Sequence, residues 1–146
     1  VFSEVGVNSR LDEMQAAILR VKLRHIEIEL SHRRALATIY RSSIENKSIL
    51  PPDETWYTNS YHIFPVVTDE RDALKLFLAE NGIGSEIHYP IPPYKQKALA
   101  GNDNWGKYPV SDCLHRCELS LPISTATSAD KVKFVADCIN NFFKNS

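Results

Sequence analysis

A segment without glycine or proline extends from Leu11 to about Asn46, and it predicts one long helix. The apolar residues of this segment fall on two helical stripes. The first stripe comprises Leu11, Met14, Ile18, Val21 and Ile28, and the second comprises Leu19, Leu23, Ile26 and Leu30. A helix on the surface of an isolated domain needs only one apolar stripe. We therefore expect contacts on two sides, with the domain that follows and with a partner absent from this chain.

The residues ahead of this helix are polar and suited to holding a ligand. Gly6 favours a turn, and Asn8 and Arg10 supply hydrogen-bond donors. Ser9 is placed to cap the helix, and Asp12 completes a capping box three residues later. A polar segment ahead of a helix usually closes a site that other parts of a protein begin.

The size and charge of the chain restrict its class. Its 146 residues suffice for one domain, or for a small domain with an appended element. A formal net charge of −1 gives no electrostatic reason to expect nucleic acid or an acidic membrane as a partner. No apolar run approaches the roughly 18 residues that span a bilayer. Because the chain starts at Val1 without an initiator methionine, we expect it to be the back part of a longer protein.

The three cysteines, Cys113, Cys117 and Cys138, predict neither a disulfide framework nor a metal site. Their odd number and low density argue against a secreted disulfide scaffold. Cys113 and Cys117 flank His115, but on a helix His115 points away from the face that carries the two sulfurs. The usual Cys-x-x-Cys spacing is also absent. We expect buried, reduced thiols, no metal, and a cytoplasmic protein.

The remainder of the chain predicts alternating strands and helices. Strands are expected at residues 60–67, 84–89 and 118–123. Helices are expected from residue 68 or 69 to 81, at 94–99, at 109–117 and from 128 to near the C-terminus. The fold class is then α/β, a small sandwich with a three-stranded sheet that follows the long helix. We divide it into residues 1–50, a connecting segment with the long helix, and residues 51–146, a small C-terminal α/β domain.

Four motifs in this order resemble the C-terminal segment of DegT/StrS-type sugar aminotransferases. They read Gly6-x-Asn8-x-Arg10-Leu11-Asp12-Glu13-x-Gln15-Ala16-Ala17-x-Leu19, Ser60-x-His62-x-Phe64, His88-Tyr89-Pro90-Ile91-Pro92, and Leu119-Ser120-Leu121-Pro122-Ile123. The resemblance covers the whole chain but only the last third or so of a family member.

The resemblance implies the C-terminal domain of an aspartate-aminotransferase-type (fold type I) enzyme, active as a homodimer with pyridoxal 5'-phosphate (PLP). Such enzymes pass an amino group, here from glutamate, to a keto-deoxysugar nucleotide in polysaccharide or O-antigen biosynthesis. The sequence from Ile87 to Pro93 most resembles that of enzymes that act on 3-keto sugars of thymidine diphosphate. The Schiff-base lysine and its aspartate partner belong to the large domain. The family's lysine motif is absent from this chain, so we expect no catalytic residue here and no activity from the chain alone.

Four residues are candidates for ligand binding. The resemblance places Asn8 at the cofactor phosphate of the neighbouring subunit, whereas the alternative is a turn residue beside Gly6. Arg10 is suited to grip a phosphate or carboxylate, or else is a surface arginine in the first helical turn. His88 and Tyr89 end a strand before a proline-rich turn, and the resemblance places them at the sugar-nucleotide pocket. Their alternatives are an exposed His88 and a Tyr89 packed under the loop.

Two other functions remain open from the sequence. One is a dehydratase branch of the same family, in which histidine replaces the catalytic lysine and a hydroxyl group is removed. The residue that decides between the two activities lies outside this chain. The other is a stand-alone α/β module for ligand binding or dimerisation. The two-striped helix argues against that module, because a stand-alone protein would expose one stripe.

Overall fold

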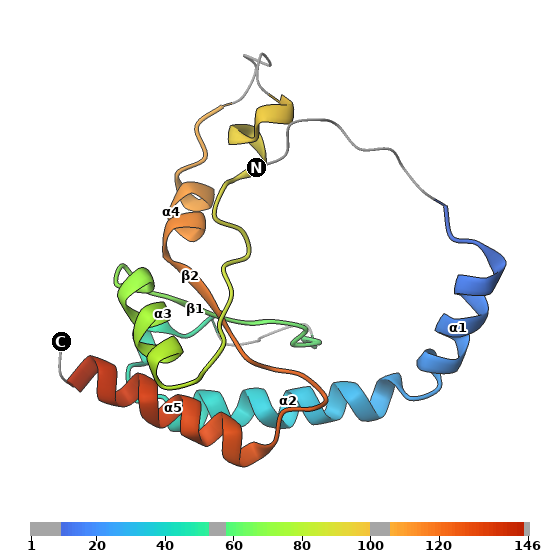
Figure 1. The fold of residues 1–146 in the computed structure, drawn as a ribbon, viewed down its shortest axis with the longest axis horizontal. Coiled ribbons are helices and arrows are strands. Elements are labelled where there is room, and N and C mark those ends of the chain that lie inside the picture. Colours follow the sequence, from blue (N-terminus) through green and yellow to red (C-terminus); the bar gives the residue numbers. More distant parts are fainter. Residues whose placement is uncertain (1–9, 53–57, 100–105, 145–146) are drawn as a thin grey trace.

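The computed structural model describes residues 10–52, 58–99 and 106–144 (Figure 1). Its elements are α1 (Glu13–Leu23), α2 (Ile26–Ser43), η1 (Lys47–Ile49), β1 (Phe64–Val67), α3 (Arg71–Glu80), η2 (Pro93–Lys95), η3 (Lys97–Leu99), α4 (Pro109–Cys117), β2 (Glu118–Leu121) and α5 (Ala129–Lys144). The described part of the chain is therefore mostly helical, with one two-stranded antiparallel sheet.

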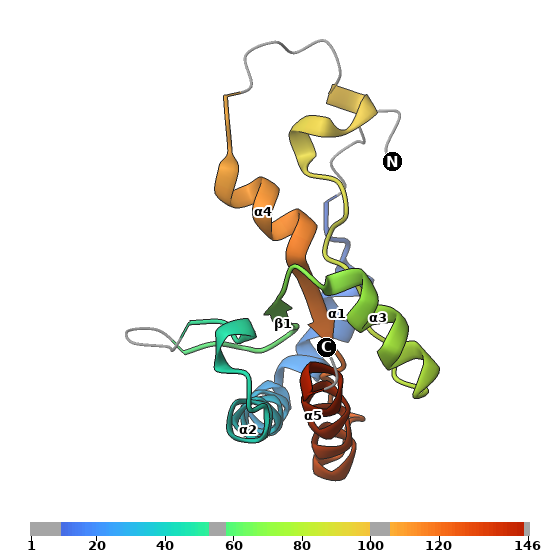
Figure 2. The ribbon, with the colours of Figure 1, turned by 90° about the vertical axis from the view of Figure 1, so that its left-hand side faces the viewer.

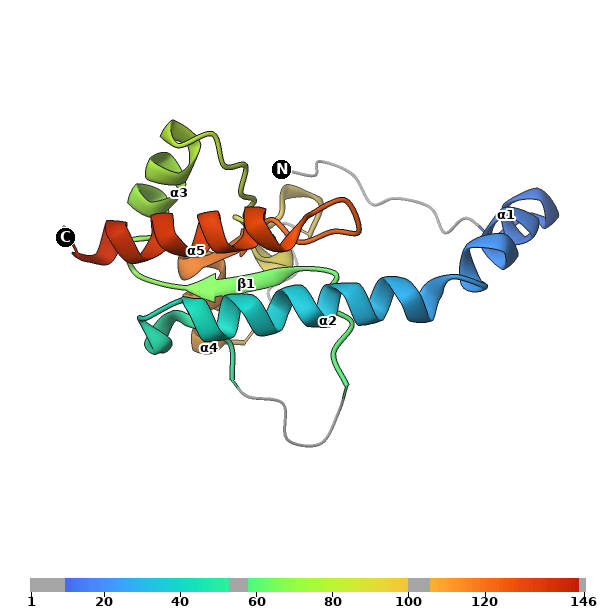
Figure 3. The ribbon, with the colours of Figure 1, turned by 90° about the horizontal axis from the view of Figure 1, so that it is seen from below.

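The expectation of one unbroken helix from Leu11 to Asn46 is wrong. A turn at Arg24 and His25 separates α1 from α2, and the two helices point in different directions (Figure 3). The N–H of Arg24 bonds the carbonyl of Val21 at 3.3 Å, and that of His25 bonds Lys22 at 3.0 Å. Both bonds span three residues, the spacing of a tighter 3-10 turn. The absence of glycine and proline permits a continuous helix but does not impose one.

The start of α1 also differs from the prediction. Asp12 itself caps the helix, because its carboxylate accepts the N–H of Gln15 at 2.7 Å. The helix therefore begins at Glu13, and Asp12 does not stand in its third helical position. Ser9, the predicted cap, lies outside the described residues.

Helix α1 has no buried residue and stands apart from the other helices (Figures 1 and 3). Every member of the first predicted stripe is exposed, and Met14 exposes 76% of its surface. In the second stripe Leu19 and Leu23 are exposed, whereas Ile26 and Leu30 are half-buried. The described residues thus leave the apolar surface of α1 uncovered.

The core lies where the second half of α2 and α5 run side by side beneath the sheet (Figure 2). Among its fully buried side chains are Tyr40, Ile44, Phe64, Val66, Leu74, Leu78, Leu119, Val132 and Ile139. The Tyr40 ring lies 4.7 Å from that of Phe64, and its hydroxyl donates to the carbonyl of Pro122 at 2.8 Å. Residues on both sides of position 50 contribute to this one cluster. The division into two parts at residue 50 stays a prediction.

The predicted three-stranded sheet is wrong in its number of strands. In the described chain β1 pairs with β2 in antiparallel register, Phe64 opposite Leu121 and Val67 opposite Glu118. The predicted strand at residues 84–89 contributes only a bridge between Glu86 and Ser120. Two residues later the His88 N–H bonds the Glu118 carboxylate at 2.9 Å. In a strand of the sheet, such N–H groups would donate to backbone carbonyls of the neighbouring strand.

Strand β1 is shorter than predicted because the backbone turns ahead of it. Tyr61 has a positive φ of 47°, which an extended strand does not allow. The side-chain oxygen of Asn59 accepts the Tyr61 N–H at 2.9 Å and stabilises this turn. The strand therefore starts at Phe64.

Three of the later helices confirm their predictions. Helix α3 ends at Glu80, the φ of 73° at Gly82 two residues later suits a glycine, and the Ile83 N–H bonds the Leu78 carbonyl at 2.9 Å. Helix α4 begins at Pro109, and the Ser128 hydroxyl accepts the Lys131 N–H at 3.4 Å ahead of α5. The helix expected at 94–99 is instead the pair of 3-10 turns η2 and η3. Within the described residues no helix is long and apolar enough to cross a membrane.

Asn140 ties α5 to the end of α2, and its replacement by alanine is expected to destabilise the fold. Its amide donates to the Ser43 carbonyl at 2.9 Å and accepts the Glu45 N–H at 2.8 Å, with only 9% of the residue exposed. Asn140→Ala leaves both backbone groups without these partners, so the free energy of unfolding should fall by about 2 kcal/mol. Urea denaturation of the 146-residue chain measures it, with the exposed Lys133→Ala as control. Equal losses in the two variants would contradict the role given to Asn140.

Candidate functional site

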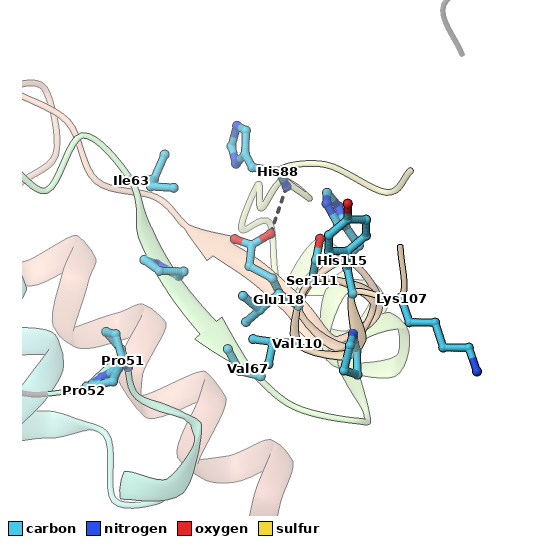
Figure 4. A pocket seen from close by; sticks show the side chains of 14 residues that line it. Pro51, Pro52, Ile63, Val67, His88, Lys107, Val110, Ser111, His115 and Glu118 are labelled. Carbon is cyan, nitrogen blue, oxygen red and sulfur yellow. Dashed lines mark hydrogen bonds between the residues drawn. The ribbon is translucent and has the colours of Figure 1, made fainter. Parts of the chain in front are cut away.

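A pocket of about 840 Å³ opens between β1, the start of β2 and α4 (Figure 4). Most of its lining is apolar, and its polar side chains gather at one side. The lining residues are Pro51, Pro52, Ile63, Pro65, Val67, His88, Lys107, Tyr108, Pro109, Val110, Ser111, Leu114, His115 and Glu118. We call this the His88 pocket. Its shape and lining are typical of a site for a small organic ligand.

Glu118 is the buried charge of the His88 pocket. It is the first residue of β2, directly after α4, and exposes only 7% of its surface. One carboxylate oxygen, Oε2, accepts the backbone N–H of His88 at 2.9 Å (Figure 4). The other, Oε1, accepts the Ser120 hydroxyl at 2.5 Å. A carboxylate buried to this degree needs such hydrogen bonds to remain in place.

Ser120 connects this carboxylate to the imidazole of His88. It lies two residues after Glu118, so the two side chains leave β2 on the same face. The Oγ atom of Ser120 is 2.9 Å from Nδ1 of His88, and the residue is 5% exposed. Glu118, Ser120 and His88 therefore form one continuous hydrogen-bonded series, which we call the Glu118 relay.

His115 holds the other side of the same segment. Its Nδ1 atom is hydrogen-bonded to the backbone carbonyl of Tyr89. Because a carbonyl only accepts hydrogen bonds, Nδ1 of His115 carries the hydrogen. The His88–Tyr89 segment is thus fixed from β2 through the His88 N–H and from α4 through the Tyr89 carbonyl.

The two predicted substrate residues lie together at this site. His88 lines the pocket, and its ring centroid lies 5.4 Å from that of Tyr89, edge to face. Tyr89 exposes 66% of its surface, so it is not packed under the loop. Both side chains are presented to solvent beside the pocket, where a ligand has access to them. Their role in binding a substrate stays a prediction.

The two predicted cofactor residues are not brought to this site by the described structure. Arg10 is exposed and lies before α1, which stands away from α4 and β2 (Figures 1 and 3). Asn8 lies outside the described residues. Their roles at a cofactor phosphate stay predictions.

The proline-rich loop after Tyr89 is anchored on α4. The Tyr94 hydroxyl donates to Asp112 at 2.5 Å, and Lys95 pairs with the same carboxylate at 2.5 Å. The hydrogen bond to Asp112, with a smaller contribution from desolvation, raises the pKa of Tyr94 to about 12. Hydrogen bonds from Lys95, which has the larger effect, and from Tyr94 lower the pKa of Asp112. The Tyr94 ring also lies 5.2 Å from that of Tyr108, which lines the pocket.

The cysteines of α4 are not arranged as metal ligands. His115 points to Tyr89, and the Cys117 thiol donates to Asp69 at 3.2 Å. Burial is the main cause that raises the pKa of Cys117, and it also raises that of Cys138. Across residues 10–52, 58–99 and 106–144, no group of three or more histidine, cysteine or carboxylate side chains is placed to hold a metal ion.

Sequence reasoning missed the two residues that hold His88. Glu118 and Ser120 alternate with Leu119 and Leu121, a period of two that places a polar pair on one face of a strand. That alternation was the available signal. It does not tell a solvent-facing pair from a buried one, because both give the same pattern.

The chain belongs to the DegT/DnrJ/EryC1/StrS aminotransferase family, which matches residues 1–140. It is 41% identical over 140 residues to the dTDP-3-amino-3,6-dideoxy-α-D-galactopyranose transaminase of Aneurinibacillus thermoaerophilus, covering 94% of this chain and 38% of that protein. It is 35% identical over 143 residues to the dTDP-3-amino-3,4,6-trideoxy-α-D-glucose transaminase of Streptomyces venezuelae, covering 94% and 37%. The crystal structure of S. venezuelae DesV superposes with a TM-score of 0.81 at 35% identity, over 94% of this chain and 38% of DesV.

The chain thus spans under two fifths of the length of these relatives, 38% of the first. The resemblance to this family implies the cofactor PLP, and a sugar aminotransferase structure of the same fold is described in a PLP form. The His88 pocket does not fit this cofactor, because PLP needs a lysine amine facing its aldehyde. Lys107 stands at the rim and its side chain extends away from the pocket (Figure 4). Among the described residues, the lining of the His88 pocket therefore does not fit PLP itself.

Removing the Asp112 carboxylate is expected to lower the pKa of Tyr94. The raised pKa favours the neutral phenol in the folded state, so the stabilisation is fully present below about pH 10 and is lost as the pH rises towards about 12. The ultraviolet titration curves of the wild type and Asp112→Ala should differ by the tyrosinate absorbance of one of the six tyrosines. In the variant that tyrosine, Tyr94, ionises nearer pH 10. The exposed Asp130→Ala is the control. Coincident titration curves for wild type and Asp112→Ala would disprove the Tyr94–Asp112 anchor.

Proposed function

We propose that this chain is the C-terminal part of a PLP-dependent aminotransferase that passes an amino group from glutamate to a keto-deoxysugar nucleotide. The observation that carries the proposal is the His88 pocket, where a buried carboxylate and serine hold an imidazole at the edge of an apolar cavity. The chain that builds this pocket is 41% identical to a sugar-nucleotide transaminase. In the proposal the pocket is a wall of the substrate site.

The lining of the pocket is chemically suited to a deoxysugar nucleotide. Val67, Val110 and Leu114 give an apolar floor that matches the C–H faces of a deoxysugar or the face of a base. The imidazole of His88 and the phenol of Tyr89 bind hydroxyl groups or stack on a ring. The two curated relatives named above act on 3-amino sugars of thymidine diphosphate. We extend this to a 3-keto sugar of thymidine diphosphate as the substrate here.

Bound PLP would supply the electron sink that stores the amino group between the two half-reactions. By resemblance, Asn8 would hold the cofactor phosphate of the neighbouring subunit through its amide, and Arg10 would add a guanidinium nearby. Homodimerisation is part of the proposal, and the uncovered apolar surface of α1 supports it. The same surface disfavours a stand-alone module. The dehydratase alternative differs in one residue outside this chain, so the gene region upstream of Val1 decides between lysine and histidine.

A chimeric enzyme tests the proposed function. Residues 1–140 of this chain replace the matching segment of the A. thermoaerophilus transaminase, which supplies the rest of the protein. We expect the purified chimera to show the visible absorbance of bound PLP and to transfer the amino group of dTDP-3-amino-3,6-dideoxy-α-D-galactopyranose to a keto acid. His88→Ala in the chimera should raise KM about tenfold, the effect of losing one hydrogen bond of about 1.4 kcal/mol.

A folded chimera that binds PLP but does not transaminate this sugar or a related 3-amino sugar nucleotide would contradict the proposal. An unchanged KM in His88→Ala would remove His88 from the substrate site. The exposed Lys133→Ala, on the helix face away from the core, is the matched control and should leave both constants unchanged.

Asn8→Ala in the same chimera tests the cofactor role. Loss of an amide donor to the phosphate should weaken PLP binding about tenfold, measured by titration of the apoenzyme with PLP. Ser3→Ala, in the same N-terminal stretch but outside the quoted motif, is the control. Equal affinity in Asn8→Ala and Ser3→Ala would show that Asn8 does not hold the phosphate.

A further inference from the structure

The direction of every hydrogen bond in the Glu118 relay follows from the groups that form it. The His88 backbone N–H donates to Oε2 of Glu118 at 2.9 Å, because an amide N–H only donates. An ionised carboxylate only accepts, so the Ser120 hydroxyl donates its single hydrogen to Oε1 at 2.5 Å. The Ser120 oxygen then has lone pairs and no second hydrogen to offer. It must accept from Nδ1 of His88, 2.9 Å away.

The tautomer of His88 follows from this direction. A neutral imidazole carries one hydrogen, and in the relay that hydrogen is on Nδ1. The other ring nitrogen, Nε2, therefore has a free lone pair. Glu118 and Ser120 expose only 7% and 5% of their surfaces, so water has little access to reverse their hydrogen bonds. The Nε2 atom of His88 is therefore a hydrogen-bond acceptor.

We propose that Glu118 and Ser120 are positioning residues that hold His88 as the Nδ1–H tautomer and present Nε2 to the ligand as a hydrogen-bond acceptor. The ligand group that this arrangement selects is a donor, such as a sugar hydroxyl, and not a phosphate or carbonyl oxygen. The identity of the ligand as a sugar nucleotide rests on the proposed function. The tautomer does not, because it depends only on the relay.

Glu118→Gln is a sharp probe because it reverses the relay with almost no change in shape. The His88 backbone N–H still needs an acceptor, so the amide oxygen of the new side chain occupies that position. Its NH₂ group then faces Ser120 and donates to Oγ. The Ser120 hydroxyl is free to donate to Nδ1 of His88. That nitrogen must now be the acceptor, and the ring hydrogen moves to Nε2.

The measurement is the imidazole ¹⁵N chemical shifts of the 146-residue chain at about pH 8.5, where an ordinary imidazole is neutral. Pyrrole-type and pyridine-type nitrogens are well separated in such spectra. His88→Asn identifies the His88 signals among the five histidines. The variants are Glu118→Gln, Ser120→Ala and the control Ser85→Ala. Ser85 lies on the same segment, and its buried hydroxyl has no hydrogen-bond partner in the described part of the chain.

The relay predicts a hydrogen on Nδ1 in the wild type and in Ser85→Ala, a hydrogen on Nε2 in Glu118→Gln, and averaged signals from both tautomers in Ser120→Ala. A wild-type spectrum with the hydrogen on Nε2, or no change in Glu118→Gln, would overturn the inference. Where circular dichroism shows that Glu118→Gln has unfolded, Ser120→Ala decides: averaged signals support the relay, and a retained Nδ1–H contradicts it.

Kinetics of the chimera separate the relay from the proposed function. Glu118→Gln should raise KM for the amino sugar nucleotide about tenfold and leave kcat within about twofold, since the lost acceptor binds ligand without entering the chemistry. A chimera without transaminase activity but with the predicted tautomers contradicts the proposed function and leaves the relay intact. An active chimera in which Glu118→Gln has the wild-type KM contradicts the role given to the relay in ligand binding.

Discussion

Strand β2 joins the hydrophobic core to the His88 pocket. All four of its residues are buried, and its two faces serve different purposes. Leu119 and Leu121 belong to the hydrophobic core, while Glu118 and Ser120 reach the backbone and ring of His88. Because successive side chains of a strand point to opposite faces, the packing of the leucines fixes the direction of the two polar residues. The precision of the site is therefore inherited from the core.

The His88–Tyr89 segment is not a strand, but hydrogen bonds from β2 and from α4 hold its backbone on both sides. The Glu86–Ser120 bridge brings it to β2, and the Glu118 carboxylate then replaces the next backbone partner. His115 and the Tyr94–Asp112 pair attach the following residues to α4. Residues 84–89 do not form a strand, and the His88 and Tyr89 side chains are exposed on a backbone held by hydrogen bonds. Sites supported in this way keep their geometry before a ligand arrives.

Local patterns predicted much of the fold. Three helices were predictable from signals within a few neighbouring residues. These signals are Gly82 after α3, Pro109 in the first turn of α4, and the apolar face of α5. The break at Arg24 was not predictable, because no glycine or proline marks it in the sequence. The strand expected at residues 84–89 was wrong because the His88 N–H bonds the side chain of Glu118, 30 residues away, and not a backbone carbonyl.

The site was predictable only in part, for the same physical reason. His88 and Tyr89 were proposed from a predicted strand end, which the structure does not have, from a proline-rich turn and from the family resemblance. Glu118 and Ser120 act through tertiary contacts across β2, and a buried carboxylate has the same sequence pattern as an exposed one. The described residues do not cover the apolar surface of α1. The chain spans only 38% of the length of the first relative in its family.

The most direct test of the account is a crystal structure of the chimeric enzyme with PLP and a dTDP-3-amino sugar bound. We expect a sugar hydroxyl within hydrogen-bond distance of Nε2 of His88, the relay unchanged behind it, and α1 covered by other parts of the dimer. A sugar nucleotide bound elsewhere, with the His88 pocket free of ligand, would contradict it.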